Sequence, residues 1–352
     1  MGRVESGIMS GRGLIVLLFY SRLQLSVHWS EITHSHLLRK VCLMLDNVSV
    51  LATILSFGLA ATGCRATLPL APMAAVATAN LPSVSGVSIC WIETAQSLGF
   101  TSSSLLVRHP QGDILIDAGA GSQFDEDIED HDFWGRIRLK IVQGPLRPDP
   151  ILPEALRLAG EDPRAIKKII ITHAHGDHLG GLEDMPTSQG LVSQAELDFI
   201  RGWDGHPSFH ALPKLAQKLL PRLTAIEFKS GPYEGFSASA DLFGDGSVVL
   251  VNLPGHTPGS LGAIVNLKQG LRLFHVGDAA HDMSAITDGL EKPLLTRSTD
   301  MDKKAADELV ARLHQLWLED KTLVFLPAHD RAQWLKVFGG EPPRCWKSRE
   351  AE

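Results

Sequence analysis

The chain has 352 residues, of which 44% are hydrophobic and 21% are charged, and its formal net charge is -7 at pH 7. This composition is typical of a globular protein that is long enough for one large domain and some additional segments. An acidic chain without a basic run is a poor candidate for binding nucleic acid, and its charge is compatible with a small-molecule substrate as partner.

The first 64 residues differ from the rest of the chain. An apolar run, Val41–Gly63, follows Arg39 and Lys40 and ends in small residues before Cys64. This order resembles a bacterial lipoprotein signal, in which Cys64 would be the lipidated first residue of the mature chain. It predicts a protein of the bacterial periplasm or cell envelope that contacts the membrane only through this lipid anchor. A cleaved ordinary signal peptide and a membrane anchor are the alternative interpretations.

Three segments are therefore expected: a leader over 1–64, a tether over 65–85 and a folded domain over 86–345. The tether is predicted from its content of Ala, Pro and Thr. Two cysteines, Cys90 and Cys345, remain in the domain. They could pair in an oxidising compartment, but two cysteines are a weak signal for a disulfide.

Alternating and β-branched runs predict strands, and capping patterns predict helices. The expected strands before the central motif are Val87–Ile92, Ser104–Val107 and Asp113–Ile116. The expected helices are Leu152–Leu158, a helix that begins after the capping box at Ser193, Ala211–Leu220 and the amphipathic segment Asp302–Leu318. Phe124–Val142 is expected to form a helix or a lid.

The most informative stretch is 172–181, which reads THAHGDHLGG and follows the β-branched run Ile169–Ile171. A buried strand that ends in a polar, glycine-containing loop is the expected structure. Within six residues this loop holds His173, His175, Asp177 and His178, which are ligands that divalent zinc, manganese or iron accept. A single His here would suggest a polar surface turn, but this density favours a metal site.

Three later strands end in further candidate ligands. Val248–Leu253 leads to His256, Leu271–Val276 leads to Asp278, and Leu323–Leu326 leads to His329. Each of these would be a weak signal alone, since His and Asp are ordinary turn residues. Together, four strand ends supply His or Asp, and a rigid sheet that presents polar groups at its strand ends is suited to building a site.

The segment HAHGDH at 173–178 matches the HxHxDH signature of the metallo-β-lactamase superfamily, and the resemblance extends over about Val87–Ala332. It implies an α/β fold, a four-layer αββα sandwich with metals at the sheet edge. The implied cofactors are two divalent ions, with Zn²⁺ expected and Mn²⁺ or Fe²⁺ as alternatives. The first metal would be bound by His173, His175 and His256, the second by Asp177, His178 and His329, and Asp278 would bridge the two.

The resemblance also implies a hydrolytic mechanism. Two cations that share a water lower its pKa toward ~7 for zinc, which supplies hydroxide at neutral pH. Asp177 could in addition carry a proton to the leaving group. Asp117 lies at a strand end that adjoins the metals in this family, so it could orient a ligand His or simply cap a turn.

Within the family the chain resembles the lactonase branch in the GHTPGS segment, in the His329–Asp330 pair and in Ser193–Ile200. A lactone or other ester is therefore the expected substrate. His281 occupies the position of a lactonase Tyr and could donate a hydrogen bond to an oxyanion. The alternatives are a glyoxalase II-like thioesterase, a phosphotriesterase, a β-lactamase, a mononuclear iron persulfide dioxygenase and a non-catalytic binding protein. Asp278 argues against a β-lactamase, because the true β-lactamases of this fold lack the bridging Asp.

Overall fold

The computed structural model describes residues 65–70, 86–97, 100–129, 131, 133, 135–137, 146, 148–202, 213–267 and 270–346. The predicted leader, the site of predicted lipidation at Cys64 and the loop 203–212 lie outside these residues. Among the residues that are described, no helix combines the length and the apolar character that crossing a membrane requires.

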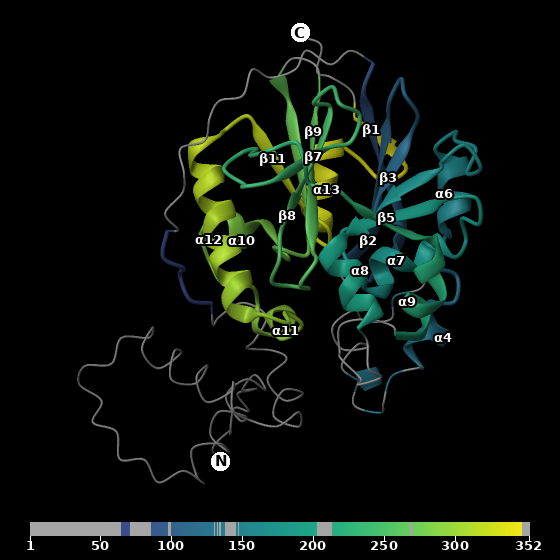
Figure 1. Ribbon diagram of the computed structural model, residues 1–352, viewed down its shortest axis with the longest axis horizontal. Helices are drawn as coiled ribbons and strands as arrows, with labels where there is room; N and C mark the ends of the chain where they lie inside the picture. The colour runs from purple at the N-terminus through teal and green to yellow at the C-terminus, as the bar shows by residue number, and fades with distance from the viewer. Residues whose placement is uncertain are drawn as a thin grey trace, which may run out of the picture. The chain divides into compact units, whose positions relative to one another are not determined.

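Two sheets form the centre of the domain (Figure 1). The seven-stranded sheet has the order β12 (Arg344–Cys345), β1 (Ser88–Ser97), β2 (Phe100–Arg108), β3 (Ile114–Ile116), β4 (Lys168–Ile170), β5 (Gln189–Ser193) and β6 (Leu223–Ile226). The five-stranded sheet has the order β11 (Leu323–Pro327), β10 (Arg272–Gly277), β9 (Leu261–Asn266), β8 (Val248–Asn252) and β7 (Ser239–Asp241).

Helices cover the outer face of each sheet, as Figure 1 shows. Beside the seven-stranded sheet lie α4 (Phe124–Ile128), α6 (Leu152–Leu158), α7 (Gly176–Leu179), α8 (Gln194–Arg201) and α9 (Pro213–Leu219). Beside the five-stranded sheet lie α10 (Met283–Thr287) and α12 (Lys303–Glu319). The chain also forms α11 (Leu294–Arg297) and α13 (Arg331–Phe338).

The alternation of side chains along the strands produces three apolar layers. On β1, Ile89 and Trp91 pack in a core with Leu250 and Ala263 of the other sheet. The intervening Cys90 and Ile92 pack in the core formed with the helices beside the seven-stranded sheet. On the other side, α10 and α12 pack on Phe274 and neighbouring residues of the five-stranded sheet. The predicted αββα sandwich is confirmed.

The strand order brings the predicted ligand loops to one edge. β3, β4, β5 and β6 are parallel, so Asp117 and Thr172 follow neighbouring strands at the same end of the sheet. β10 and β11 are also parallel, which places Asp278 near His329. The edges of the two sheets meet where the Leu261 N–H donates to the Thr172 carbonyl over 3.0 Å.

Several expected elements agree closely with the structure. α6 has the predicted bounds, and Ser193 and Asp302 cap α8 and α12 with their side chains. Of the predicted segment Phe124–Val142, α4 forms the first part and 138–142 lies outside the described residues.

The beginning of the predicted tether packs on the domain. The Leu68 N–H donates to the Gly289 carbonyl over 2.8 Å, and Arg65 forms an ion pair with Asp282 at 3.2 Å. The part of the chain that contacts the domain therefore begins before residue 86, and 71–85 lies outside the described residues.

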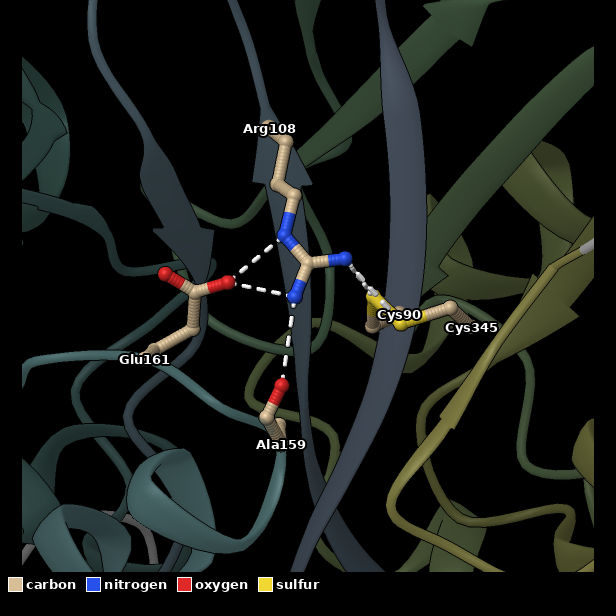
Figure 2. Close-up of a disulfide and its surroundings, with 5 residues drawn as sticks. All are labelled: Cys90, Arg108, Ala159, Glu161 and Cys345. Carbon is tan, nitrogen blue, oxygen red and sulfur yellow. Dashed lines mark hydrogen bonds and ion pairs between the residues drawn. A yellow bond between two sulfur atoms is a disulfide. The ribbon is translucent and has the colours of Figure 1, made fainter.

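A disulfide between Cys90 and Cys345 joins β1 to the two-residue strand β12 (Figure 2). Nη1 of Arg108 lies 3.0 Å from the Cys90 sulfur and 3.2 Å from the Cys345 sulfur. The same guanidinium donates to Glu161 and to the Ala159 carbonyl at the end of α6. The disulfide therefore fastens the short edge strand β12 to its neighbour β1 in the sheet.

We expect the disulfide to stabilise the domain, because it links residues 255 positions apart and restricts the unfolded chain. Reduction, or the Cys90→Ala/Cys345→Ala double substitution, should lower the free energy of unfolding by about 2–5 kcal/mol. Urea titration with and without a non-chelating phosphine reductant measures this change. The double variant serves as control, since the reductant should not alter its midpoint. Equal midpoints for the wild type in both conditions would contradict the prediction.

Candidate metal centre

All seven side chains predicted as metal ligands converge at the edge where the two sheets meet. They form two groups, in each of which the potential ligand atoms lie within 4.8 Å of one another. The first group is His173, His175, His256 and Asp278, and the second is Asp177, His178 and His329. Asp177 and His178 come from the short helix α7, directly after the loop that carries His173 and His175.

In the first group, three imidazole nitrogens point at a common position. Nε2 of His173 lies 2.8 Å from Nδ1 of His175, which lies 3.0 Å from Nε2 of His256. A zinc ion with bonds of about 2.0–2.1 Å to nitrogen would place tetrahedral ligands roughly 3.3 Å apart. The spacing of the three nitrogens is close to that of ligands around one ion.

The second group has a similar spacing. Nε2 of His178 lies 3.2 Å from Nε2 of His329, and the latter lies 3.5 Å from Oδ2 of Asp177. All three side chains are buried. Two imidazoles and a carboxylate are a donor set suited to zinc, manganese or iron.

Asp278 lies between the two groups. Its Oδ2 is 3.2 Å from Nε2 of His256, and its Oδ1 is 3.1 Å from Nε2 of His329 and 3.3 Å from Nε2 of His178. Although it approaches these nitrogens, Oδ1 is buried and has no hydrogen-bond partner among the described residues. A buried anionic oxygen without a donor needs another source of positive charge, so the site fits a bound cation.

Three histidines of the site have a hydrogen-bond acceptor at Nδ1, the ring nitrogen that faces away from the cluster. Nδ1 of His178 lies 2.8 Å from Asp117, Nδ1 of His256 lies 2.8 Å from Asp300, and Nδ1 of His329 lies 2.7 Å from the Thr101 carbonyl. Such acceptors fix the tautomer and raise the basicity of a ligating His.

Of the two roles left open for Asp117, the geometry agrees with the orienting one. Besides His178, its carboxylate accepts hydrogen bonds from the Thr172 N–H at 2.7 Å and from the Thr172 hydroxyl at 2.9 Å. It is fully buried and has a positive φ of 60°. Asp117 thus ties the end of β3 to the loop that carries the first ligands.

Sequence reasoning missed several groups around the site. Asp300 orients His256 from 44 residues away, and Lys292 forms a buried ion pair with Asp300 and donates to the Asp278 carbonyl at 2.9 Å. Phe100 stacks on the ring of His329, with centroids 4.0 Å apart. No motif marked these residues, since their spacing in the sequence has no regular relation to the ligands that they contact.

His281 lies beside the second group. Its ring centroid is 5.9 Å from that of His329 and 6.3 Å from that of Phe100, and the residue is partly exposed. Burial of the ring and the neighbouring His329 lower the pKa of His281 to about 4. Its imidazole is therefore neutral at pH 7, and it can donate a hydrogen bond without carrying charge.

The carboxylates and the histidines of the site shift one another's pKa values in opposite directions. Burial alone would lower the pKa of His178, but Asp117 and Asp278 raise it well above its ordinary value. Burial would raise the pKa of Asp278, but His329 and His178 hold it well below its ordinary value. The site therefore maintains an ionised carboxylate at its centre.

A sequence model described as the Metallo-beta-lactamase superfamily matches residues 98–329. The N-acyl homoserine lactonase AttM of Agrobacterium fabrum is 27% identical over 178 residues, which are 51% of this chain and 64% of the relative. A probable metallo-hydrolase of Mycobacterium tuberculosis is 27% identical over 288 residues, 76% of this chain and 87% of the relative. The chain thus spans somewhat less than two thirds of the length of the lactonase.

Among solved structures, this chain is similar to an N-acyl homoserine lactone hydrolase with the product N-hexanoyl-L-homoserine bound. The two chains superpose with a TM-score of 0.49 and share 18% sequence identity. The alignment covers 73% of this chain and 94% of that chain.

We expect the Asp117→Asn substitution to weaken metal binding at the second group by about 10–100-fold, because an amide orients His178 less well than a carboxylate. Isothermal titration of the metal-free protein with Zn²⁺ measures this loss. Asp113→Asn is a matched control, since Asp113 precedes the same strand and accepts a hydrogen bond from the His109 N–H, far from the ligands in the fold. Wild-type affinity in the Asp117→Asn variant would contradict an orienting role.

Proposed function

Because this chain belongs to the metallo-β-lactamase superfamily, we propose that it is a dinuclear metal-dependent hydrolase that acts on a lactone or another ester bond. The observation that carries the proposal is Asp278, whose carboxylate lies 3.2 Å from Nε2 of His256 in one group and 3.1 Å from Nε2 of His329 in the other. A binding protein would have no need of such a shared anion. The match to a probable metallo-hydrolase over 76% of the chain supports the hydrolase class.

The residues present fit two divalent cations, with zinc as the expected metal. His173, His175 and His256 would hold one ion, Asp177, His178 and His329 would hold the other, and Asp278 would contact both. When bound, such ions supply Lewis-acid chemistry, in which they activate water as hydroxide and polarise the substrate carbonyl.

Side chains of the site would perform the remaining tasks. Asp177 is buried and its Oδ2 lies 3.5 Å from His329, and in this proposal its carboxylate would pass a proton to the leaving group. His281 would donate a hydrogen bond to the oxygen on which negative charge develops. Phe100, stacked on His329, would exclude water from that side of the second group.

The choice of a lactone rests on the resemblance of the sequence to the lactonases. Asp278 argues against a β-lactam, and the complete second group argues against a mononuclear iron enzyme. The match to an N-acyl homoserine lactonase favours a cyclic ester over a thioester or a phosphotriester.

We also propose a location in the periplasm or cell envelope, with Cys64 as the lipidated residue. The apolar run before Cys64 motivates this proposal, and the Cys90–Cys345 disulfide supports it, because disulfides persist in oxidising compartments. Incorporation of radiolabelled palmitate in a bacterial host tests the lipid anchor, and a Cys64→Ala variant that is labelled equally well would contradict it.

The function is tested by screening the zinc-loaded protein against lactones, thioesters, phosphotriesters and β-lactams. Lactones should give the highest kcat/KM. The Asp278→Ala substitution should lower kcat by at least about 100-fold, since it removes electrostatic preorganisation at the reacting centre. Chelation of the metal should abolish the activity and Zn²⁺ should restore it. Unchanged hydrolysis by the Asp278→Ala variant would show that the activity arises elsewhere.

Substitution of His281 tests whether this residue donates a hydrogen bond to the oxyanion. His281→Ala should lower kcat by about 100-fold, the cost of losing one oxyanion donor, and His281→Tyr should restore part of it. Because the pKa of His281 is lowered to about 4, the ring is neutral over the neutral pH range. The ratio of wild-type to His281→Ala activity should therefore stay constant from about pH 5.5 to 8.5. A ratio that falls as the pH rises through about 6.5 would instead indicate an imidazolium.

A further inference from the structure

Glu196 is a buried carboxylate that has no place in the proposed set of ligands. It lies in the first turn of α8 and its exposed fraction is 0%. A buried carboxylate is costly unless donors satisfy it, so its surroundings require an explanation. Burial raises the pKa of Glu196, while hydrogen bonds from Thr257, Ala174 and Gly259 oppose that rise.

The hydrogen bonds of Glu196 join two loops that are distant in the sequence. Its Oε1 accepts from the Ala174 N–H at 2.7 Å. Its Oε2 accepts from the Thr257 hydroxyl at 2.6 Å and from the Gly259 N–H at 3.1 Å. Ala174 lies between His173 and His175, and Thr257 directly follows His256. One carboxylate thus binds the main chain between His173 and His175 and, through a hydroxyl and a main-chain N–H, the loop that carries His256.

The loop after β8 is shaped so that this carboxylate can reach it. A Cβ on Gly259 would lie only 2.0 Å from the Glu196 nitrogen, so only glycine allows this close approach. The Ser193 hydroxyl, which caps α8, donates to the Gly259 carbonyl at 2.7 Å. The start of α8 is therefore packed directly against the loop that carries His256.

The second group of ligands is supported by other residues. Asp117 orients His178, and the Thr101 carbonyl orients His329. Within the part of the chain that the structure describes, the carboxylate of Glu196 accepts hydrogen bonds only from the two loops of the first group. An effect of Glu196 on metal binding should accordingly be confined to the first group.

We propose that Glu196 is a positioning residue for the first metal site: its carboxylate holds the loop of His173 and His175 at a fixed distance from the loop of His256. The inference rests on the proposed dinuclear function and adds to it a residue that acts through the main chain. It also explains why the Thr257 hydroxyl and the side-chain-free Gly259 are found next to a ligand.

The Glu196→Gln variant tests this role, because the amide has nearly the same volume but turns an N–H toward groups that are themselves donors. The metal-free protein is titrated with Co²⁺, which replaces zinc in imidazole and carboxylate sites and absorbs visible light. His256→Ala and His329→Ala, each lacking one ligand of one group, supply the reference spectra of the two sites. We expect the first site to bind Co²⁺ about 10–100-fold more weakly and the second to be unchanged.

Ser193→Ala is the matched control, because it removes the cap of α8 and a hydrogen bond to the same loop but leaves the carboxylate in place. If Glu196 served only to hold α8 in the fold, both variants would lower thermal stability and neither would weaken one site selectively. Site-selective loss in Glu196→Gln but not in Ser193→Ala supports the proposal. Equal weakening at both sites, or unchanged binding at both, overturns it.

If Glu196→Gln does not fold, the same Co²⁺ titration is made with Thr257→Val. This substitution removes one hydrogen bond to the Glu196 carboxylate and keeps the residue volume. A smaller loss confined to the first site supports the role of Glu196, and unchanged affinity overturns it. The wild-type titration separates this inference from the proposed function. A wild type that binds one Co²⁺ would overturn the dinuclear function, whereas two ions bound equally by wild type and variants would overturn only the role of Glu196.

Discussion

The structure depends on one electrostatic constraint: five imidazoles and two carboxylates are gathered with little access to water, and their charges must balance. Asp278 is the centre of this balance, because its carboxylate lies close to His256 of the first group and to His329 of the second. Hydrogen bonds alone do not satisfy the group, since Oδ1 of Asp278 finds no donor among the described residues. Cations resolve the imbalance, and for this reason the arrangement favours a metal centre over a polar core.

The two-sheet fold provides the rigidity that such a cluster requires. The apolar layer between the sheets fixes the strand ends, and the hydrogen bond from Leu261 to Thr172 joins the sheets at the site. Gly277, with a φ of 53°, turns the chain away from β10 beside Thr172, where a Cβ would come within 3.1 Å of the Thr172 side chain. Ligands placed on loops would otherwise vary in position, so the packed sheets fix the spacing of the ligand atoms.

How far the sequence predicts this structure depends on how local each signal is. The ligands come directly after strands, and capping side chains such as Ser193 and Asp302 act within one helical turn, so both could be predicted. Strand β5 could not, because its residues include Gln189 and Gly190, and the space at the glycine is limited by Leu223 and Leu182, which are distant in the sequence. Asp117 could be named as a possible orienting residue, but two other supporting groups were missed. Asp300 is remote in sequence, and the acceptor at Thr101 is a main-chain carbonyl that any residue could supply.

The residues that orient the histidines of the two ligand groups differ in charge, and this difference affects which cation each group would favour. His178 is backed by the fully buried Asp117, which no Lys or Arg side chain approaches among the described ion pairs. His256 is backed by Asp300, whose charge Lys292 offsets. The first group also contains three imidazoles where the second has two and Asp177. More negative charge therefore surrounds the second group, which would favour a harder and more strongly hydrated cation there. The first position depends more on geometry, since neutral imidazoles bind well only when their nitrogens are held at the correct spacing.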